Sequence, residues 1–539
     1  MNPFKSLSFQ IKIIANCIQN KHIMKINSIL FFAFLLGLSV LISCNKREEN
    51  IQQNIDSDNI LQYKKTLSAV PEGEPLKPSK LDAFVKQTIQ EKNDFRWEWL
   101  DVHTLWSAIQ YGENTIAIGY QPTNYKNINE NIHTIDIQAG EWKQVHDALI
   151  SLIVEETNKN SAQPIKWEDM LVEDDAKLPI LTFRNKNKEV ITKLFNLENV
   201  RYIEPMDYWP ADAQRSSSGC DGSTTALNTT DWVNITPGSR MPWNFVNCNI
   251  PNAWNISEGQ GITIGVIDAG ISSSQTLLGS NFNNGLSNVS RTVTTDFTLG
   301  SSAFTSCTHG TSMSGIAVGP RNNLNNSTGV AYKSNLHFIR ACNDVILDAS
   351  SERTAVKNAL VRMGDRSAVR IISMSIGTPF SSGVLNDGVN YAYNKGKMIF
   401  AAAGTSFSWT SWWGVIYPAA YSNCIAVTGV KEGGSTCATC HDGSEVDFTI
   451  PMERNSNSDR NTLSLSQSGN SPSYVGGSSS ATATAAGIAA LVWSAKPTLT
   501  RDQVYLSLRN TSQFYPSTNS SKGYGNLNAA AAVNAGLAY

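Results

Sequence analysis

Hydrophobic residues in the second half of the chain form short unbroken runs instead of alternating with polar residues. Five such runs are GITIGVID (261–268), LHFIRAC (336–342), RIISMSIG (370–377), MIFAAAG (398–404) and CIAVTGV (424–430). Helix-like stretches lie between several of them, for example SERTAVKNALVRMG (351–364) and NDGVNYAYNKG (386–396). This pattern is typical of parallel strands covered by helices on both faces. In such sheets, functional sites gather at the carboxyl ends of the strands.

The first half has the pattern of a smaller domain that mixes strands and helices. Predicted strands cover residues 114–122, 178–184 and 200–205, and predicted helices cover residues 141–156 and 188–197. We therefore expect a small α+β domain over residues 81–208. Residues 45–80 are polar and are predicted to form a tether. Residues 209–242 lack periodicity and are predicted to be a linker to a large domain at 243–539.

The N-terminal region carries the pattern of an export signal. Lys25 precedes an apolar run from Ile29 to Ile42, which is too short for a transmembrane helix and suits a secretory hydrophobic region. Leu41-Ile42-Ser43-Cys44 resembles a bacterial lipobox, so residues 1–44 are predicted to be a leader and lipoprotein signal with Cys44 lipidated. A plain signal peptide cut elsewhere is the alternative. We expect an exported protein at the bacterial cell envelope, in the periplasm or on the outer-membrane surface, that contacts the membrane through this lipid.

Charge and cysteine content narrow the class of protein. Charged residues are 16% of the chain and the formal net charge is -2, without the clustered basic excess of a nucleic-acid-binding protein. Seven cysteines follow the leader, and in an exported protein they favour disulfides over metal ligands. The odd count implies one that is unpaired or removed. CATCH (437–441) also spells a c-type haem attachment motif, but no haem-binding module surrounds it.

Three residues in the large domain have the chemistry for nucleophilic catalysis. Asp268 ends a buried run, where a carboxylate is costly without a partner. Among the seven histidines, His309 and His441 remain as candidate general bases after the leader, the small domain and the core-like His337 are set aside. Ser479 is the middle of three serines before a helix rich in Ala, Thr and Gly. Asp, His and Ser together suit acyl transfer, although a strand-end cap and a plain turn explain the first and last equally well.

Residues 243–539 resemble the subtilisin-type serine proteases, the subtilases. GVIDAGI matches the family's Asp block, HGTSMSG its His block, and the segment Gly477–Gly487 its Ser block. The blocks follow in the order Asp, His, Ser, which is also the order in subtilisin. The resemblance implies a subtilisin-like, doubly wound α/β fold with a mostly parallel sheet flanked by helices. It also implies a triad of Asp268, His309 and Ser479.

The same resemblance implies the residues that handle the substrate. The oxyanion position holds Thr405 where the family usually has Asn, and the Ser479 backbone N–H is the second expected donor. The expected substrate-binding residues are Ser375, Ile376, Gly377, Ala402, Ala403 and Gly404. The aromatic stretch 407–413 either packs on itself or lines a subsite through Trp409, Trp412 or Trp413.

Residues 199–205, NVRYIEP, resemble the last strand of a subtilase propeptide. The resemblance implies a serine endopeptidase that acts on protein or peptide substrates and is made as a precursor. Its own propeptide is expected to inhibit the enzyme, which is released after processing. The alternative is a catalytically weak or inactive subtilase-fold binding lipoprotein. Catalysis needs no cofactor, and the sequence locates no structural calcium ion. By similarity to some subtilases, Cys307 is expected to pair with Cys342, and Cys424 with Cys437 or Cys440.

Overall fold

The computed structural model describes residues 60–92, 94–210, 219–405 and 414–539. These residues all belong to one unit, in which the small and the large domain are in contact. Cys44 and the three tryptophans of the aromatic stretch lie outside the described residues.

The large domain is built on a sheet that has nine strands among the described residues, in the order β15-β14-β13-β12-β11-β10-β7-β9-β8. In this order, all neighbouring strands between β13 and β8 are parallel, whereas β13–β14 and β14–β15 are antiparallel pairs. The strands are β7 (Thr263–Asp268), β8 (Val293–Phe297), β9 (Asn335–Arg340), β10 (Val369–Met374), β11 (Met398–Ala402), β12 (Ile425–Lys431), β13 (Val446–Arg454), β14 (Asn457–Leu465) and β15 (Pro472–Val475). The mostly parallel sheet predicted from the sequence is confirmed.

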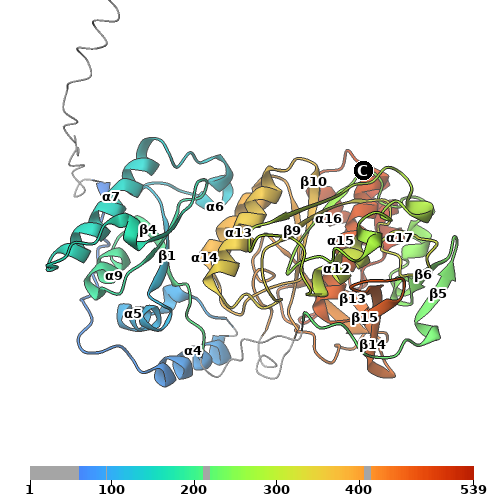
Figure 1. Ribbon diagram of the computed structural model, residues 1–539, viewed down its shortest axis with the longest axis horizontal. Coiled ribbons are helices and arrows are strands. Elements are labelled where there is room, and N and C mark those ends of the chain that lie inside the picture. Colours follow the sequence, from blue (N-terminus) through green and yellow to red (C-terminus); the bar gives the residue numbers. More distant parts are fainter. Residues whose placement is uncertain (1–59, 93, 211–218, 406–413) are drawn as a thin grey trace, which may run out of the picture. The chain divides into compact units, whose positions relative to one another are not determined.

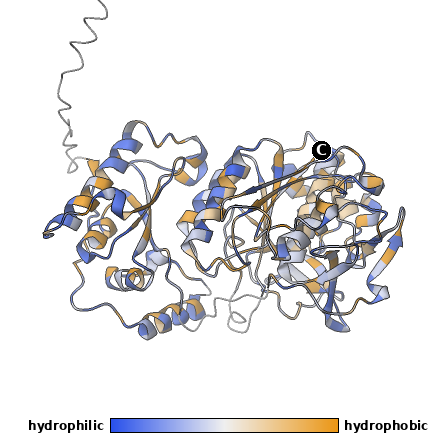
Figure 2. Cartoon of the chain, viewed as in Figure 1, coloured by the Kyte–Doolittle hydropathy of each residue, from blue (hydrophilic) through white to orange (hydrophobic). Residues whose placement is uncertain are grey.

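Helices cover both faces of this sheet (Figure 1). The main helices are α12 (His309–Val318), α13 (Ser350–Asp365), α14 (Gly383–Asn394), α15 (Gly477–Ala495), α16 (Arg501–Asn510) and α17 (Ala529–Leu537). In β7, Val266 packs in one core with α12 and α15, and the next residue, Ile267, packs in a second core with α13. Because successive side chains of a strand point to opposite faces, a strand buried on both sides must be apolar throughout. Figure 2 shows hydrophobic residues along these central strands.

The small domain contains a four-stranded antiparallel sheet within the described residues, in the order β2-β3-β1-β4. Its strands are β1 (Thr115–Tyr120), β2 (Leu171–Asp174), β3 (Ile180–Arg184) and β4 (Val200–Pro205). Its longer helices are α4 (Pro78–Lys92), α5 (Val102–Tyr111), α7 (Gly140–Asn158) and α9 (Lys188–Phe195). Figure 2 shows both hydrophobic and hydrophilic residues on α4 and α7, as expected for helices with one buried face.

Two segments predicted as connectors are more structured than the sequence suggested. Leu61 is buried in the core of the small domain, and Tyr63 bridges to Leu197, so the predicted tether packs on this domain from residue 60 onward. In the predicted linker, β5 (Trp232–Ile235) and β6 (Ser239–Pro242) form a hairpin. Both segments contain few apolar residues, so their sequences give little local signal of structure. Much of their structure depends on contacts with residues distant in the chain. The described residues contain no helix with the length and apolar character needed to cross a membrane.

Candidate active site

Asp268 and His309 meet at the carboxyl end of strand β7. Asp268 is fully buried, and its carboxylate lies 2.9 and 3.0 Å from Nδ1 of His309. It also accepts a hydrogen bond from the backbone N–H of Ala269 at 2.7 Å. Because a carboxylate only accepts hydrogen bonds, Nδ1 of His309 must carry the proton in this pair. The other ring nitrogen, Nε2, is then free to accept a proton when the imidazole is neutral.

The small residues around His309 allow helix α12 to approach the sheet closely. A Cβ atom at Gly310 would lie 2.2 Å from the backbone oxygen of Gly270 and 2.8 Å from the ring of Phe338. A Cβ atom at Gly315 would lie 2.6 Å from Oγ of Ser464. All three distances are below van der Waals contact, so any larger residue would push the helix outward. The glycines therefore help to hold His309 against Asp268.

The three serines at the start of α15 have different surroundings. Ser478 and Ser480 are buried, whereas Ser479 is partly exposed. Ser478 Oγ accepts a hydrogen bond from the backbone N–H of Gly404 at 3.0 Å, and Ser480 donates to the backbone oxygen of Gly477 at 3.1 Å. Only Ser479, among these three, combines partial exposure with a position on the wall of a pocket that a substrate could enter. The outer two serines hold the turn together.

Ser479 and His309 lie at the N-terminal ends of two helices, α15 and α12, that pack against each other. The hydroxyl of Ser479 donates a long hydrogen bond of 3.4 Å to the backbone oxygen of Ser375, and the Ser375 hydroxyl donates to the backbone oxygen of Ser479 at 3.0 Å. Ser479 and His309 thus lie in the first turns of two packed helices, and Asp268 orients the histidine.

A pocket beside Ser479, which we call the Ser479 pocket, contains five of the six predicted substrate-binding residues. These are Ser375, Ile376 and Gly377 after β10, and Ala402 and Gly404 at the end of β11. The sixth, Ala403, is buried and does not line the pocket. The remaining lining residues are Val345, Ile346, Pro379, Thr405, Ile416, His441, Ser478 and Ser479. The wall carries no acidic or permanently charged side chain among the described residues.

Thr405 lies at the predicted oxyanion position on this wall. Its hydroxyl is 3.3 Å from Oγ of Ser478, and a Cβ atom at Gly477 would lie 2.5 Å from it. Gly477 also has a positive φ of 74°, which favours glycine. The first N–H groups of helix α15, including that of Ser479, lack partners within the helix and can bind a negative oxygen. The site thus offers a hydroxyl and a helix N-terminus as donors.

His441 is a residue of this pocket that the sequence left undecided. It is 4% exposed, and its Nδ1 lies 3.0 Å from the backbone oxygen of Gly414. It has no contact with Asp268, whose partner is His309. No local sequence pattern predicts this placement, because residues from three loops bring the ring to the pocket.

The disulfides differ from those predicted. Cys307 pairs with Cys220, and Cys437 pairs with Cys440. Both predicted pairings, Cys307–Cys342 and Cys424 with Cys437 or Cys440, are therefore wrong. Cys248, Cys342 and Cys424 are free thiols buried in the core, where burial raises the pKa of each.

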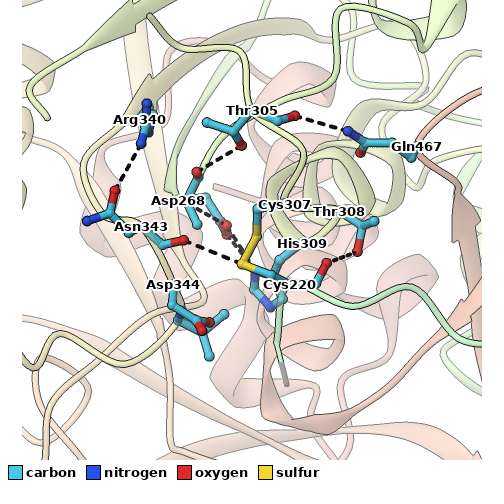
Figure 3. Close-up of a disulfide and its surroundings, with 12 residues drawn as sticks. Cys220, Asp268, Thr305, Cys307, Thr308, His309, Arg340, Asn343, Asp344 and Gln467 are labelled. Carbon is cyan, nitrogen blue, oxygen red and sulfur yellow. Dashed lines mark hydrogen bonds and ion pairs between the residues drawn. A yellow bond between two sulfur atoms is a disulfide. The ribbon is translucent and has the colours of Figure 1, made fainter. Parts of the chain in front are cut away.

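Figure 3 shows why Cys307 pairs with Cys220. Thr308 donates two hydrogen bonds to the backbone oxygen of Cys220, from its N–H (3.1 Å) and its hydroxyl (3.0 Å). These bonds hold the segment at Cys220 beside the residue that precedes His309. The disulfide thus links the chain that follows the small domain to the start of α12.

The pairing of Cys437 with Cys440 contradicts the haem interpretation of CATCH. Both sulfurs are used in the disulfide, so neither is available for a thioether bond to haem. In the part of the chain that the structure describes, no group of three or more His, Cys, Asp or Glu residues could hold a metal ion.

The large domain is similar to known proteins. Residues 259–526 match the model of the subtilase family, peptidase S8. The chain is 32% identical to thermitase of Thermoactinomyces vulgaris over 201 residues, which are 37% of this chain and 66% of thermitase, just under two thirds of its length. It is 27% identical to subtilisin Savinase of Lederbergia lenta over 54% of this chain and 98% of Savinase. A protease structure from Pseudoalteromonas arctica matches 54% of this chain and 94% of its own at 23% identity, with a TM-score of 0.45.

Proposed function

We propose that the protein is an exported serine endopeptidase made as a self-inhibited precursor, because residues 259–526 match the model of the subtilase family. The observation that carries this proposal is the buried Asp268–His309 pair together with a partly exposed serine at the N-terminus of α15. The alternative, an inactive binding protein, draws its support from Thr405 alone, because a hydroxyl reaches less far than the usual amide.

In the proposed reaction, His309 removes the proton from Ser479 through Nε2 as the hydroxyl attacks the peptide carbonyl. Asp268 holds the Nδ1–H and stabilises the imidazolium that forms. The backbone N–H of Ser479 and the hydroxyl of Thr405 donate to the oxygen of the tetrahedral intermediate. His309 then gives its proton to the leaving amine, and water hydrolyses the acyl-enzyme by the same steps in reverse. No cofactor takes part in these steps.

The contacts of strand β4 support the role of the small domain as an inhibitory propeptide. Glu204 accepts hydrogen bonds from the Ser382 hydroxyl (2.8 Å) and from the backbone N–H of Gly383 at the start of α14. The carboxyl oxygens of Glu204 thus provide an acceptor for a backbone N–H of the first helical turn, which has no partner within the helix. Arg201 forms a two-pronged ion pair with Asp387 in the same helix, at 3.0 and 2.6 Å.

Helix α13 offers a second set of contacts to the small domain. Its Lys357 is fully buried and binds Asp175 and, at 3.1 Å, Glu173, both of which belong to the small domain. Its first turn is capped by Asp207, which accepts from the backbone N–H of Ser350 at 3.0 Å. A lysine buried in this way needs its partners, because unpaired buried charges are costly. The two domains are therefore complementary in charge.

The chain on both sides of residues 211–218 runs beside the Ser479 pocket. Trp209 packs edge-on against Phe380, which follows the pocket residue Pro379, with ring centroids 5.7 Å apart. A Cβ atom at Gly219 would touch the side chain of Val345, which lines the pocket. We propose that the chain is cut between these two points, after which the tail beside the pocket continues to exclude substrate until the propeptide leaves.

We further propose that Cys44 carries the lipid and that cutting releases the catalytic domain from this anchor. A cut beyond Cys220 would not separate this cysteine from the catalytic domain, because Cys220 is bonded to Cys307. A cut before Gly219 keeps this disulfide intact in the mature enzyme.

The test follows processing of the full chain produced in a bacterial envelope. Wild type should lose the propeptide on a reducing gel, release the catalytic domain from the membrane fraction and hydrolyse casein. Ser479→Ala should remain full-length in the membrane fraction and leave casein intact. Unprocessed, inactive wild type would favour the binding-protein alternative.

A further inference from the structure

His441 brings an imidazole ring to the mainly apolar wall of the Ser479 pocket. The rest of the wall is made mainly of apolar side chains and backbone, among them Ile376, Ala402 and Ile416. The His441 side chain is 4% exposed, and its Nε2 is buried without a hydrogen-bond partner among the described residues. Buried polar atoms in native proteins nearly always have a partner, so an unpaired one on a residue that lines a pocket points to a group that arrives with a ligand.

The position of the ring is fixed by contacts on its other sides. The backbone N–H of His441 donates to Gly404 at 2.9 Å, and Thr405 bridges to Cys440. The disulfide between Cys437 and Cys440 closes the loop immediately before the ring. A Cβ atom at Gly404 would lie 2.5 Å from Nδ1, so only glycine leaves room for the imidazole there. The ring is therefore preorganised, not free to search for another partner.

The hydrogen bond at Nδ1 determines what Nε2 can do. A backbone carbonyl only accepts hydrogen bonds, so Nδ1 donates its proton to Gly414. Burial lowers the pKa of His441 from its ordinary value, and the bond to Gly414 and the charge of Asp442 oppose this shift only in part. At neutral pH the ring is thus a neutral imidazole in which Nε2 is a hydrogen-bond acceptor.

We propose that His441 determines specificity by accepting a hydrogen bond from the substrate side chain that precedes the scissile bond, the P1 residue. This inference rests on the protease function proposed above. It predicts a preference for neutral P1 side chains that combine an apolar body with a terminal N–H or O–H donor, such as Gln or Tyr.

Other side chains are disfavoured by the chemistry of the same wall. Met or Phe would fill the apolar space but leave Nε2 unpaired, as it is without substrate, so neither would gain the hydrogen bond that a donor forms. Glu would bring a negative oxygen toward the lone pair of Nε2. Lys or Arg would lose its hydration without meeting a carboxylate, since the described wall has none. A site that pairs with a donor discriminates against an analogue that lacks it more strongly than an apolar pocket does.

The experiment measures kcat/KM of the processed enzyme for peptides that differ only at P1, as the matched pairs Gln and Met, and Tyr and Phe. For wild type we expect the donor member of each pair to be preferred by about 5- to 100-fold. His441→Asn keeps a donor for the Gly414 carbonyl, but its shorter side chain leaves no acceptor at the position of Nε2, so both ratios should fall to one or below. His441→Phe, which removes both nitrogens, should give the same loss. Ratios within one enzyme are unaffected by an overall loss of activity.

Asp442→Asn serves as the control, because it changes the neighbouring charge without altering the wall of the pocket, and it should keep the wild-type ratios. Wild-type ratios at or below one, or ratios that survive in both His441 variants, would overturn the role of His441 while leaving the protease function intact. Absence of both hydrolysis and labelling by a fluorophosphonate, which reacts with activated serines, would overturn the protease function and the His441 proposal with it.

Discussion

The carboxyl group of Glu204 should make the inhibitory contact weaker as the pH rises. Glu204 is 3% exposed at the boundary between the two domains, and burial raises its pKa from 4.5 to about 8, against the opposing hydrogen bonds from Ser382 and Gly383. When the propeptide leaves, the carboxyl is exposed to water and its pKa returns to the ordinary value. Between pH 4.5 and about pH 8, Glu204 is therefore protonated in the complex and ionised in the free propeptide.

The sign and size of the effect follow from these two pKa values. Because the pKa is higher in the complex, the stabilisation is fully present below pH 4.5 and is lost as the pH rises through 8. The affinity falls about tenfold per pH unit in between and levels off above 8. Between pH 6 and pH 9 the dissociation constant of the propeptide should therefore increase by a factor on the order of 10².

The assay uses processed protein in which the propeptide is cut but still bound, and it measures dissociation by the return of peptidase activity on dilution. Glu204→Gln mimics the protonated carboxyl, so its affinity should depend little on pH over this range. Glu198→Gln changes an exposed carboxyl of the same domain and should retain the wild-type dependence. A wild-type affinity that is constant or increases from pH 6 to 9 would refute the reasoning, as would an unchanged slope in Glu204→Gln.

Three further predictions concern the catalytic domain. Asp268→Asn should lower kcat by about 10⁴-fold in steady-state kinetics, because it disturbs the protonation of the His309 ring. The double variant Asp268→Asn/His309→Ala should be scarcely less active, because the members of a triad act as a unit. Thr405→Ala should lower kcat by up to about 10²-fold, whereas Thr405→Asn should maintain or raise it; wild-type kinetics for Thr405→Ala would mean that another group completes the oxyanion site. Peptide mapping without reduction should find Cys220 joined to Cys307, and Cys220→Ser should lower the melting temperature of the mature enzyme; a free thiol at Cys307 in exported protein would contradict this.

The sequence predicts the parts of this molecule whose signals are local. The unbroken apolar run that ends at Asp268 forms β7, because a strand buried on both faces is apolar throughout. The helix-like stretch 351–364 lies within α13, because a helix buried on one face has apolar residues at helical spacing. Residue types leave His309 and His441 as candidate bases, and the resemblance to the subtilases selects His309, which lies beside Asp268 in the structure.

Features that depend on distant contacts could not be predicted in this way. Cys220 is brought to Cys307 by the bonds from Thr308, which connect segments 88 residues apart. The buried Lys357 has the sequence signature of an exposed helix face, and only the acidic side chains of the small domain explain its burial. His441 reaches the pocket because a disulfide loop and Gly404 place it there, and neither its neighbours nor its spacing indicates that.

The most direct test of the central claim is to identify the residue that a fluorophosphonate modifies in the processed enzyme. Mass spectrometry of tryptic peptides should locate the adduct on Ser479, with no labelling in Ser479→Ala or His309→Ala. Ser480→Ala provides the matched control from the same turn, because this serine is fully buried and bonded to Gly477, and this variant should still be labelled. Labelling that persists in Ser479→Ala, or an adduct on Ser478 in wild type, would contradict the assignment of Ser479 as the nucleophile.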